Sequence, residues 1–396
     1  MRAVVIGAGR IGCGLAGQLL HDSGYQVTFV TRDPQVAANL NRNNCYHVLL
    51  SSARHRERVT VEGLSALPVT DHAAVIDAIR QADVIVTAVC SQNMPAIAPL
   101  IAQGLAKHSG TANVLAFENM PSAGTCLRRL VLSFMPEGAD IHRHGFSGAV
   151  ISRMVTLRLG NPADSGPLTF VGDAVQDFVV DRTSLRAPLP EIKGIKLVDE
   201  YEPWVLRKLY TFSTGHATAA YLGWLKGYHY IHTAIRDGEI RQAVITAMKE
   251  GQRGLAAKFG KDFAGSQQEL DAIVSRFENA TINDPIVRVA RDPHRKLGAD
   301  ERLVGAARLA EQAGVVPEQL ALVAAAALCF SNSGKPEPCT ACFEHSKASE
   351  TLNQVCGLDA AQGFGRSVAR CWALLAPSAL PGNLLLSLKQ SMWTRV

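Results

Sequence analysis

The chain opens on a strand, a glycine-rich turn and a helix, and this feature constrains its fold more than any other. The apolar run 3–6 leads directly into Gly7-Ala8-Gly9-Arg10-Ile11-Gly12, and leucines recur with helical spacing beyond it. Such a G-x-G-x-x-G turn uses its glycines for a tight turn, for close approach of the backbone to a pyrophosphate, and for helix–strand packing. The helix N-terminus then offers free N–H groups to phosphates. We therefore expect a dinucleotide site that includes Gly7, Gly9, Arg10, Ile11 and Gly12; the alternative is a tight turn that binds nothing.

Short β-rich runs alternate with helical stretches up to about residue 190. The clearest strands are 3–6, 27–30, 84–89 and 114–117. This alternation predicts a doubly wound, Rossmann-type α/β domain with helices on both faces of a parallel sheet. Beyond Tyr201 helical patterns dominate, at 202–225, 231–257, 268–277 and 301–314. We expect a dinucleotide-binding domain over 1–192 and a mainly α-helical substrate domain over 193–396, joined near Pro188 and Pro190.

Composition narrows the class of protein. The 396 residues are 47% hydrophobic and 19% charged, as in globular proteins of two domains. The net charge of +5 is scattered, so nucleic-acid binding is not expected, whereas an anionic small molecule is compatible. We expect no signal peptide, because the sequence shows none before the first strand, and no membrane span, because no apolar run reaches the length of about 20 residues that spans a bilayer. Nine irregularly spaced cysteines fit reduced thiols, so we expect a cytoplasmic protein that does not bind membranes.

The residues after the second strand bear on the choice of cofactor. NAD enzymes commonly place a carboxylate at this point to bind the ribose hydroxyls, whereas Thr31 and Arg32 stand here. A guanidinium can bind a 2′-phosphate through two parallel hydrogen bonds, so we expect NADP(H), with Arg10 as a second cation nearby. NAD(H) remains possible, because Asp33 follows and Arg32 alone is compatible with a solvated surface charge.

Lys208, Ser213 and His216 lie on one expected helix. At about 100° and 1.5 Å per residue, they would span an arc of about 140° and a length of about 12 Å, which suits an extended substrate. A lysine in a dry cleft has a lowered pKa and can exchange a proton with an alcohol or carbonyl. Spacing alone is equally compatible with a solvated lysine, a helix serine and a core histidine.

A family resemblance favours the catalytic interpretation. The segment 207–223, RKLYTFSTGHATAAYLG, resembles the signature helix of the polyol-specific long-chain dehydrogenases, the mannitol dehydrogenase family. The glycine turn, Thr87-Ala88-Val89, Glu118-Asn119-Met120 and Arg276-Phe277-Glu278-Asn279 resemble the same family in order and spacing, as do Asp284, Arg288 and Arg295-Lys296-Leu297. The resemblance covers about residues 1 to 375.

The resemblance implies a role for each matching residue. Lys208 would be the general acid/base, Asn119 would stabilise the developing alkoxide, and His216 would contact substrate hydroxyls. Ser213 stands where the family carries a second asparagine, which keeps a donor but shortens its reach. Thr87, Ala88, Val89 and Asn119 would also contact the cofactor. The implied reaction is hydride transfer between NAD(P)H and a keto-sugar phosphate, preferably fructose 6-phosphate, to give a polyol phosphate, mannitol 1-phosphate.

A basic cluster follows the catalytic segment. Arg288, Arg291, Arg295 and Lys296 are suited to a substrate phosphate, because guanidinium groups bind phosphate bidentately. The alternative is solvated surface charge. We therefore expect Lys208, His216, Arg288, Arg295 and Lys296 to bind substrate.

Other interpretations are weaker. Cys339 and Cys342, with His345 nearby, lack a fourth zinc ligand at a convincing distance, so we expect no metal. Cys90 is better explained as a buried thiol than as a nucleophile. The alternative functions are the same chemistry on a non-phosphorylated polyol, sugar acid or specialised carbonyl compound, and a dinucleotide-binding protein without catalysis. We expect a monomer or small homo-oligomer.

Overall fold

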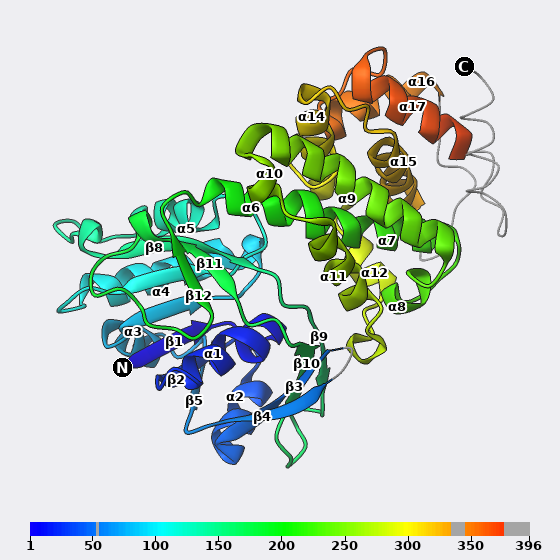
Figure 1. Ribbon diagram of the computed structural model, residues 1–396. Helices are drawn as coiled ribbons and strands as arrows, with labels where there is room; N and C mark the ends of the chain where they lie inside the picture. Colours follow the sequence, from blue (N-terminus) through cyan, green and yellow to red (C-terminus); the bar gives the residue numbers. More distant parts are fainter. Residues whose placement is uncertain (53–54, 334–344, 376–396) are drawn as a thin grey trace. The chain divides into compact units, whose positions relative to one another are not determined.

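The computed structural model describes residues 1–52, 55–333 and 345–375 (Figure 1). Its internal contacts divide the chain into two compact units, Met1–Val205 and Leu206–Val396. The division therefore falls after residue 205, whereas the sequence suggested a boundary near 192. Each unit is described by itself below.

An eight-stranded sheet organises the first unit, in the order β12-β11-β8-β7-β6-β1-β2-β5. Its strands are β1 (Arg2–Ile6), β2 (Gln26–Thr31), β5 (Ser65–Pro68), β6 (Val84–Thr87), β7 (Asn113–Ala116), β8 (Gly145–Ile151), β11 (Phe178–Asp181) and β12 (Ile195–Val198). All neighbouring pairs are parallel except β8 and β11. The chain leaves β1 toward β2 and later returns to β6 on the other side of β1. This reversal is where open α/β sheets bind ligands, at the carboxyl ends of the strands.

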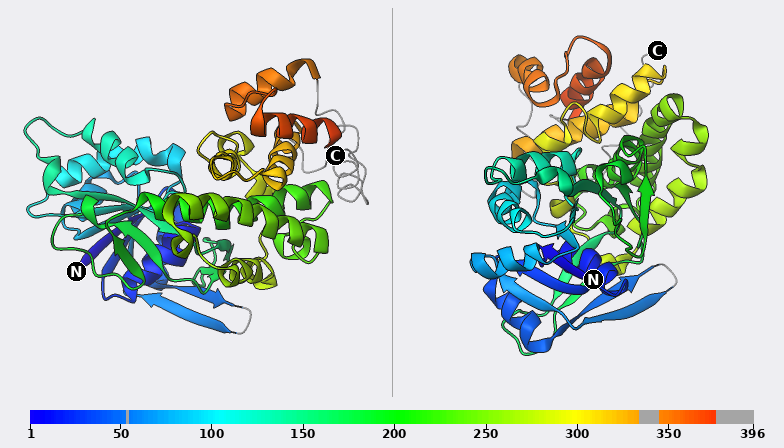
Figure 2. Two further views of the ribbon diagram at one scale, coloured as in Figure 1. Left: turned by 45° about the horizontal axis from the view of Figure 1, so that its top comes forward. Right: turned by 90° about the vertical axis from the view of Figure 1, so that its left-hand side faces the viewer.

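Both faces of this sheet are buried. Along β1, Ala3 and Val5 pack in one apolar cluster, and Val4 and Ile6 pack in another. The helices of this unit lie over the two faces (Figure 2) and are α1 (Gln18–His21), α2 (Pro34–Asn43), α3 (His72–Arg80), α4 (Met94–Ala106) and α5 (Ala123–Leu132). Strands covered on both faces need apolar residues at successive positions, which is why their sequences read as continuous apolar runs.

A second, four-stranded sheet was not expected from the sequence. It has the order β4-β3-β10-β9 and consists of β3 (Cys45–Ser51), β4 (Arg56–Glu62), β9 (Val155–Leu159) and β10 (Thr169–Asp173). Its side chains reach the helix of the glycine turn, because the Tyr46 hydroxyl donates to the Cys13 carbonyl at 2.8 Å and Arg153, just before β9, donates to the Gly14 carbonyl at 2.8 Å. The second sheet thus fixes the helix that follows the glycine turn.

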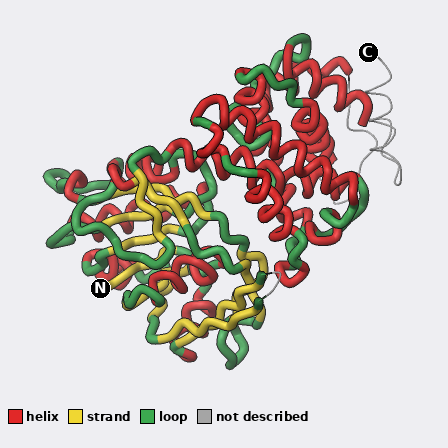
Figure 3. The backbone as a smooth tube through the Cα atoms, in the orientation of Figure 1, coloured by secondary structure: helices red, strands yellow, loops and turns green. Residues whose placement is uncertain are grey.

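The regular elements of the second unit are all helices within its described residues (Figure 3). After α6 (Glu202–Lys208), which crosses the division, its helices are α7 (Thr214–Leu225), α8 (Ile231–Ala234), α9 (Gly238–Phe259), α10 (Lys261–Ala264), α11 (Gln267–Phe277), α12 (Ile286–Ala290), α13 (Pro293–Lys296), α14 (Val304–Gln312), α15 (Glu318–Ser333), α16 (His345–Thr351) and α17 (Gly363–Leu375). Helix α7 lies at the centre: of its residues, all but His216 are buried.

Two expected helices differ from the structure. The single helix expected over 231–257 is divided into α8 and α9. The Asp237 side chain accepts hydrogen bonds from the amides of Glu239 and Ile240 and so caps the N-terminus of α9. The pattern over 202–225 is interrupted by a π-helical segment, Leu209–Ser213. A second π segment, Gly12–Gly17, follows the glycine turn. Such segments widen a helix locally and often lie at functional sites.

Candidate functional site

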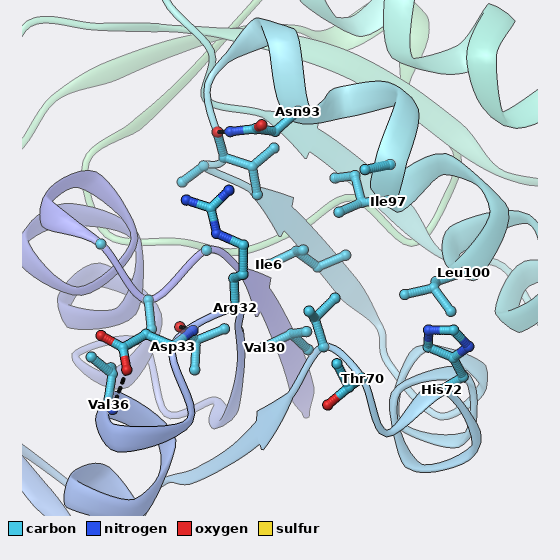
Figure 4. Close-up of a pocket in the computed structure, with 18 of the residues that line it drawn as sticks. Ile6, Val30, Arg32, Asp33, Val36, Thr70, His72, Asn93, Ile97 and Leu100 are labelled. Carbon is cyan, nitrogen blue, oxygen red and sulfur yellow. Dashed lines mark hydrogen bonds between the residues drawn. The ribbon is translucent and has the colours of Figure 1, made fainter.

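A pocket of about 590 Å³ lies at the carboxyl ends of β1 and β2 (Figure 4). Its walls include the glycine turn, the end of β2, the loop after β6 and one face of α4. The predicted cofactor residues that line it are Gly7, Gly9, Thr31, Arg32, Ala88 and Val89. Volume and position suit the adenosine half of a dinucleotide, because the end of the second strand is where such folds bind the adenosine ribose.

The glycines of the turn are required by geometry. Gly7 has a φ of 111°, and a Cβ there would lie 2.5 Å from the Ala88 carbonyl oxygen. A Cβ on Gly12 would lie 1.7 Å from the Gly7 carbonyl oxygen. At Gly9, by contrast, a Cβ would meet no atom within 4 Å, so the space above this residue is open. The turn is therefore tightly packed at Gly7 and Gly12, and it leaves open space at Gly9, where a pyrophosphate would approach.

Arg32 and Asp33, which the sequence left as alternative contacts for the cofactor, differ in their surroundings at the end of β2. Asp33 begins α2, where its carboxylate accepts hydrogen bonds from the amides of Gln35 and Val36 at 3.0 and 3.4 Å. Arg32 is exposed and extends into the pocket (Figure 4), and it has no ion-pair or hydrogen-bond partner within the described ranges. Asp33 is thus engaged in capping, whereas the guanidinium of Arg32 is available to a ligand.

Other predicted cofactor residues do not line this pocket. Arg10 points to the second sheet, where it donates to the Thr156 carbonyl at 3.0 Å. Ile11 and Gly12 belong to the start of the helix. Asn119 lies in the loop after β7 and is exposed.

Glu118 is a residue of this region that the sequence analysis did not assign to the site. Its carboxylate is 4% exposed. It accepts a hydrogen bond from the Thr87 hydroxyl at 2.8 Å and one from the Val89 amide at 3.1 Å. Burial raises its pKa to about 7, against the lowering effect of these hydrogen bonds. The sequence signal that could have assigned Glu118 to the site was its position beside Asn119 in the segment that resembles the family.

In the second unit, Lys208 is half-buried at the end of α6. Desolvation lowers the pKa of its amine to about 7, and the positive charges of Arg302, Arg295 and Arg276 add to this effect while Glu301 opposes it. Such an amine exchanges protons near neutral pH. The even α-helical spacing assumed from the sequence is wrong, because the π segment lies between Lys208 and His216. The i→i+5 bonding of that segment brings Lys208 and Ser213 toward the same face.

His216 takes part in a charged network. Its Nε2 lies 3.0 Å from Oδ2 of Asp284, and its ring stacks on Phe277 with centroids 5.1 Å apart. Arg288 donates two hydrogen bonds, both 2.6 Å long, to the same carboxylate. Burial would raise the pKa of Asp284, but the bonds from His216 and Arg288 outweigh it and lower that pKa to about 2. Burial also lowers the pKa of His216. The imidazole is therefore neutral near pH 7, with its Nε2 hydrogen directed at Asp284 and its Nδ1 left as an acceptor.

The remaining basic residues are also held by partners. The Lys296 amine is buried and donates to the carbonyls of Val289 and Arg291, and desolvation lowers its pKa to about 6. Arg295 is more exposed and pairs with Glu301 at 3.2 Å. Glu301 also pairs with buried Arg302 at 2.8 Å. Of the predicted phosphate-binding set, Arg291 and Arg295 are thus exposed, while Arg288 and Lys296 are engaged internally.

The described residues offer neither a metal cluster nor a membrane-spanning helix. The described ranges contain no group of three or more His, Cys, Asp or Glu side chains placed to hold a metal ion. Cys339 and Cys342, considered above for zinc, lie outside those ranges, and the side chain of His345 is not described. Within the same ranges, no helix has both the length and the apolar character needed to cross a bilayer.

Comparisons with known proteins agree with the resemblance. Two family models match in succession, the mannitol dehydrogenase Rossmann domain over residues 1–194 and the mannitol dehydrogenase C-terminal domain over residues 200–345. The mannitol-1-phosphate 5-dehydrogenase of Brevibacillus brevis is 38% identical over 337 residues, which is 83% of this chain and 86% of the relative. The protein of the same name from Geobacillus thermodenitrificans is 36% identical over 373 residues, 91% of this chain and 95% of the relative.

A solved structure is similar over the whole fold. Mannitol 2-dehydrogenase of Pseudomonas fluorescens, in a ternary complex with NAD and D-mannitol, aligns with 100% of this chain and 94% of its own, with a TM-score of 0.77 and 16% identity. At this identity the likeness concerns the fold alone. The predicted family and the predicted fold class, a Rossmann-type domain followed by a mainly helical domain, are confirmed.

Proposed function

Because this chain belongs to the mannitol dehydrogenase family of oxidoreductases, which use a nicotinamide dinucleotide, we propose that it interconverts fructose 6-phosphate and mannitol 1-phosphate. The observation that carries this proposal is the match with mannitol-1-phosphate 5-dehydrogenases along most of both chains. The half-buried amine of Lys208, with its pKa near 7, supports it independently.

The glycine turn fits the cofactor. The space above Gly9 is open, the Gly7 and Gly12 positions exclude any side chain, and the helix that follows presents its N-terminus there. When bound, the reduced nicotinamide supplies the hydride that the carbonyl carbon accepts. We propose that NADP(H) is preferred, because Arg32 lines the pocket without a partner among the described residues while Asp33 caps α2.

Lys208 would carry the proton. In reduction its ammonium gives a proton to the carbonyl oxygen of fructose 6-phosphate, which becomes a hydroxyl of mannitol 1-phosphate; in oxidation the neutral amine takes that proton back. A pKa near 7 leaves both forms populated at neutral pH. Donors at Asn119 and Ser213 would stabilise negative charge that develops on the same oxygen.

His216 would orient the polyol chain. Since its Nε2 hydrogen is directed at the ionised Asp284, Nδ1 can accept a hydrogen bond from a substrate hydroxyl. Arg295 would bind the phosphate, with Lys296 and Arg288 holding the surrounding backbone and Asp284 in place. We further propose a cytoplasmic enzyme that works as a monomer or small homo-oligomer.

A panel of substrates tests the proposal. Fructose 6-phosphate and free fructose are assayed with NADH and NADPH by the fall in absorbance, and mannitol 1-phosphate and mannitol are assayed in the reverse direction. We expect the highest kcat/KM with the phosphorylated pair and NADPH. Equal rates with free fructose would contradict the phosphorylated substrate, and the absence of turnover with every sugar would contradict the enzymatic function.

A further inference from the structure

The carboxylate of Glu118 joins the ends of two neighbouring strands. One of its oxygens accepts the Thr87 hydroxyl at the end of β6, and the other accepts the Val89 amide in the loop beyond it, while Glu118 itself follows β7. The backbone adds two bonds at the same place, from Phe117 to Thr87 at 2.9 Å and from Met120 to Glu118 at 2.9 Å. Glu118 therefore holds the loop after β6 against the loop after β7.

The position of this carboxylate along the sheet indicates which half of the cofactor it would meet. The end of β2 takes the adenosine ribose and the glycine turn takes the pyrophosphate, so the nicotinamide half extends in the opposite direction, over the ends of β6 and β7. Ala88 and Val89 line the pocket at that side, and the Ala88 carbonyl packs closely against Gly7. The oxygens of Glu118 lie directly behind this wall, hydrogen-bonded to it.

The surroundings of Glu118 are electrically neutral. The only causes that act on its pKa are burial and hydrogen bonds from Thr87, Val89 and its own backbone. The titratable groups on the π segment, in the loop after β6 and on α5 are Cys13, Cys90, Cys126, Arg128 and Arg129. None of them contributes a charge effect at Glu118. A charge on this carboxylate is consequently screened by no counter-charge within the described part of the unit.

We propose that Glu118 is a positioning residue that also discriminates between the two redox forms of the cofactor, its carboxylate favouring the oxidised form. The oxidised nicotinamide ring carries a positive charge and the reduced ring carries none, so only the oxidised form gains from a negative charge behind the pocket wall. This inference rests on the proposed function only in that a nicotinamide dinucleotide binds here.

The inference has a definite pH dependence. Because burial raises the pKa of Glu118 to about 7, the group is largely protonated at pH 6 and largely ionised at pH 8. Affinity for the oxidised form should therefore rise as pH rises through about 7, and affinity for the reduced form should not. Binding of the oxidised form near pH 7 therefore releases a fraction of a proton from Glu118. The ratio of the two dissociation constants cancels the titration of the cofactor's own phosphates, since both forms carry them.

The test is cofactor binding to the whole protein, measured by fluorescence or calorimetry from pH 6 to pH 8.5. In the wild type, the dissociation constant of the oxidised form relative to that of the reduced form should fall about tenfold over this range, the equivalent of one pKa unit. E118Q keeps the shape and loses the charge, so its ratio should be flat and about tenfold higher than that of the wild type at pH 8.5, but equal to it at pH 6. An equal loss of affinity for both forms at every pH would mean a merely structural role and would overturn the inference.

Matched controls isolate Glu118. Glu250 is also buried, has a pKa raised to about 7 by burial, and accepts two backbone amides, from Gln319 and Leu320. E250Q should change thermal stability and leave the ratio and its pH dependence unaltered. Lys208 titrates in the same pH range, so K208A is measured in parallel, and the dependence must persist in it.

A second variant keeps the charge and moves its titration. T87V removes a hydrogen bond that lowers the pKa of Glu118, so the midpoint of the pH dependence should shift upward. An unchanged midpoint would argue against Glu118 as the titrating group. If neither redox form bound the wild type, the proposed function and this inference would both fail; turnover of fructose 6-phosphate with a ratio insensitive to Glu118 would remove this inference alone.

Discussion

In the first unit, backbone and apolar side chains at the ends of strands form the candidate cofactor pocket, whereas in the second unit charged side chains from several helices hold the candidate catalytic residues. Gly7 and Gly12 shape the first site because they leave no room for a side chain. The second site depends on pairs such as His216 with Asp284 and Arg295 with Glu301. Loss of a single charge should therefore have a smaller effect at the first site than at the second.

The largest effect is expected from removal of the amine that would transfer the proton. K208A should lower kcat about 10²- to 10⁴-fold, the usual contribution of general acid–base catalysis. In the wild type, reduction should slow as pH rises through about 7, because the ammonium form is lost, and oxidation should slow as pH falls through it. Steady-state kinetics across pH measures both. The exposed Lys261 provides the control, K261A, which should match the wild type. Full activity in K208A would show that Lys208 does not transfer the proton.

The next effect concerns stability. D284A leaves Arg288 and His216 without their shared carboxylate, and removal of one partner from a buried ion pair costs about 3 kcal/mol or more. Urea unfolding should show this loss. Asp77 is paired with Arg80 on the surface, and D77A should be indistinguishable from the wild type. Equal stability of D284A and the wild type would show that the second site does not depend on its charged pairs.

Charge reversal at Arg295 tests whether this residue binds the substrate phosphate. R295E should raise KM for fructose 6-phosphate about 10- to 100-fold, since hydrogen bonds between charged groups contribute about 1.5 to 3 kcal/mol, and should leave KM for free fructose nearly unchanged. Arg236, an exposed arginine outside the basic cluster, supplies the control, R236E. Equal losses for both sugars would indicate that Arg295 serves only to hold Glu301.

The smallest effect is expected in the first unit. R32A should raise KM for NADPH about tenfold and leave KM for NADH within a factor of two, because only the former carries a 2′-phosphate. R58A, at an exposed arginine of β4 outside the pocket, is the control. A preference for NADH that is the same in the wild type and R32A would mean that this arginine does not distinguish NADPH from NADH.

The comparison also explains what the sequence could and could not predict. Gly7, Gly9 and Gly12 act through local backbone geometry, so their spacing alone located the turn, the strand before it and the helix after it. Partners in the second unit are far apart in the chain: Asp284 meets His216 across 68 residues. No local pattern reports such a pair, and only the family resemblance singled out Lys208 and His216.

Local signals that the sequence contained were sometimes missed. Asp237 followed by Gly238 begins a helix, yet the apolar periodicity on both sides suggested one continuous helix over 231–257. The second sheet was missed because β3 is fully buried mainly at alternate residues and most of β4 is exposed, so neither strand gives a continuous apolar run. Glu118 was overlooked because a buried acid is recognised by its surroundings rather than by its neighbours in sequence.

The π segment Leu209–Ser213 determines how a change in the length of the helix formed by α6 and α7 would affect the residues beyond it. A turn closed by i→i+5 bonds contains one residue more than an α-helical turn, so the segment works as a phase shift between α6 and α7. Deleting a single residue from it would let the turn close with ordinary α-helical bonds, and the positions beyond would keep nearly their present angle relative to those before. If the segment instead closed with α-helical bonds at its present length, His216 would turn by about 100° relative to Lys208. The π turn thus sets the angular register between the proposed proton donor and the histidine.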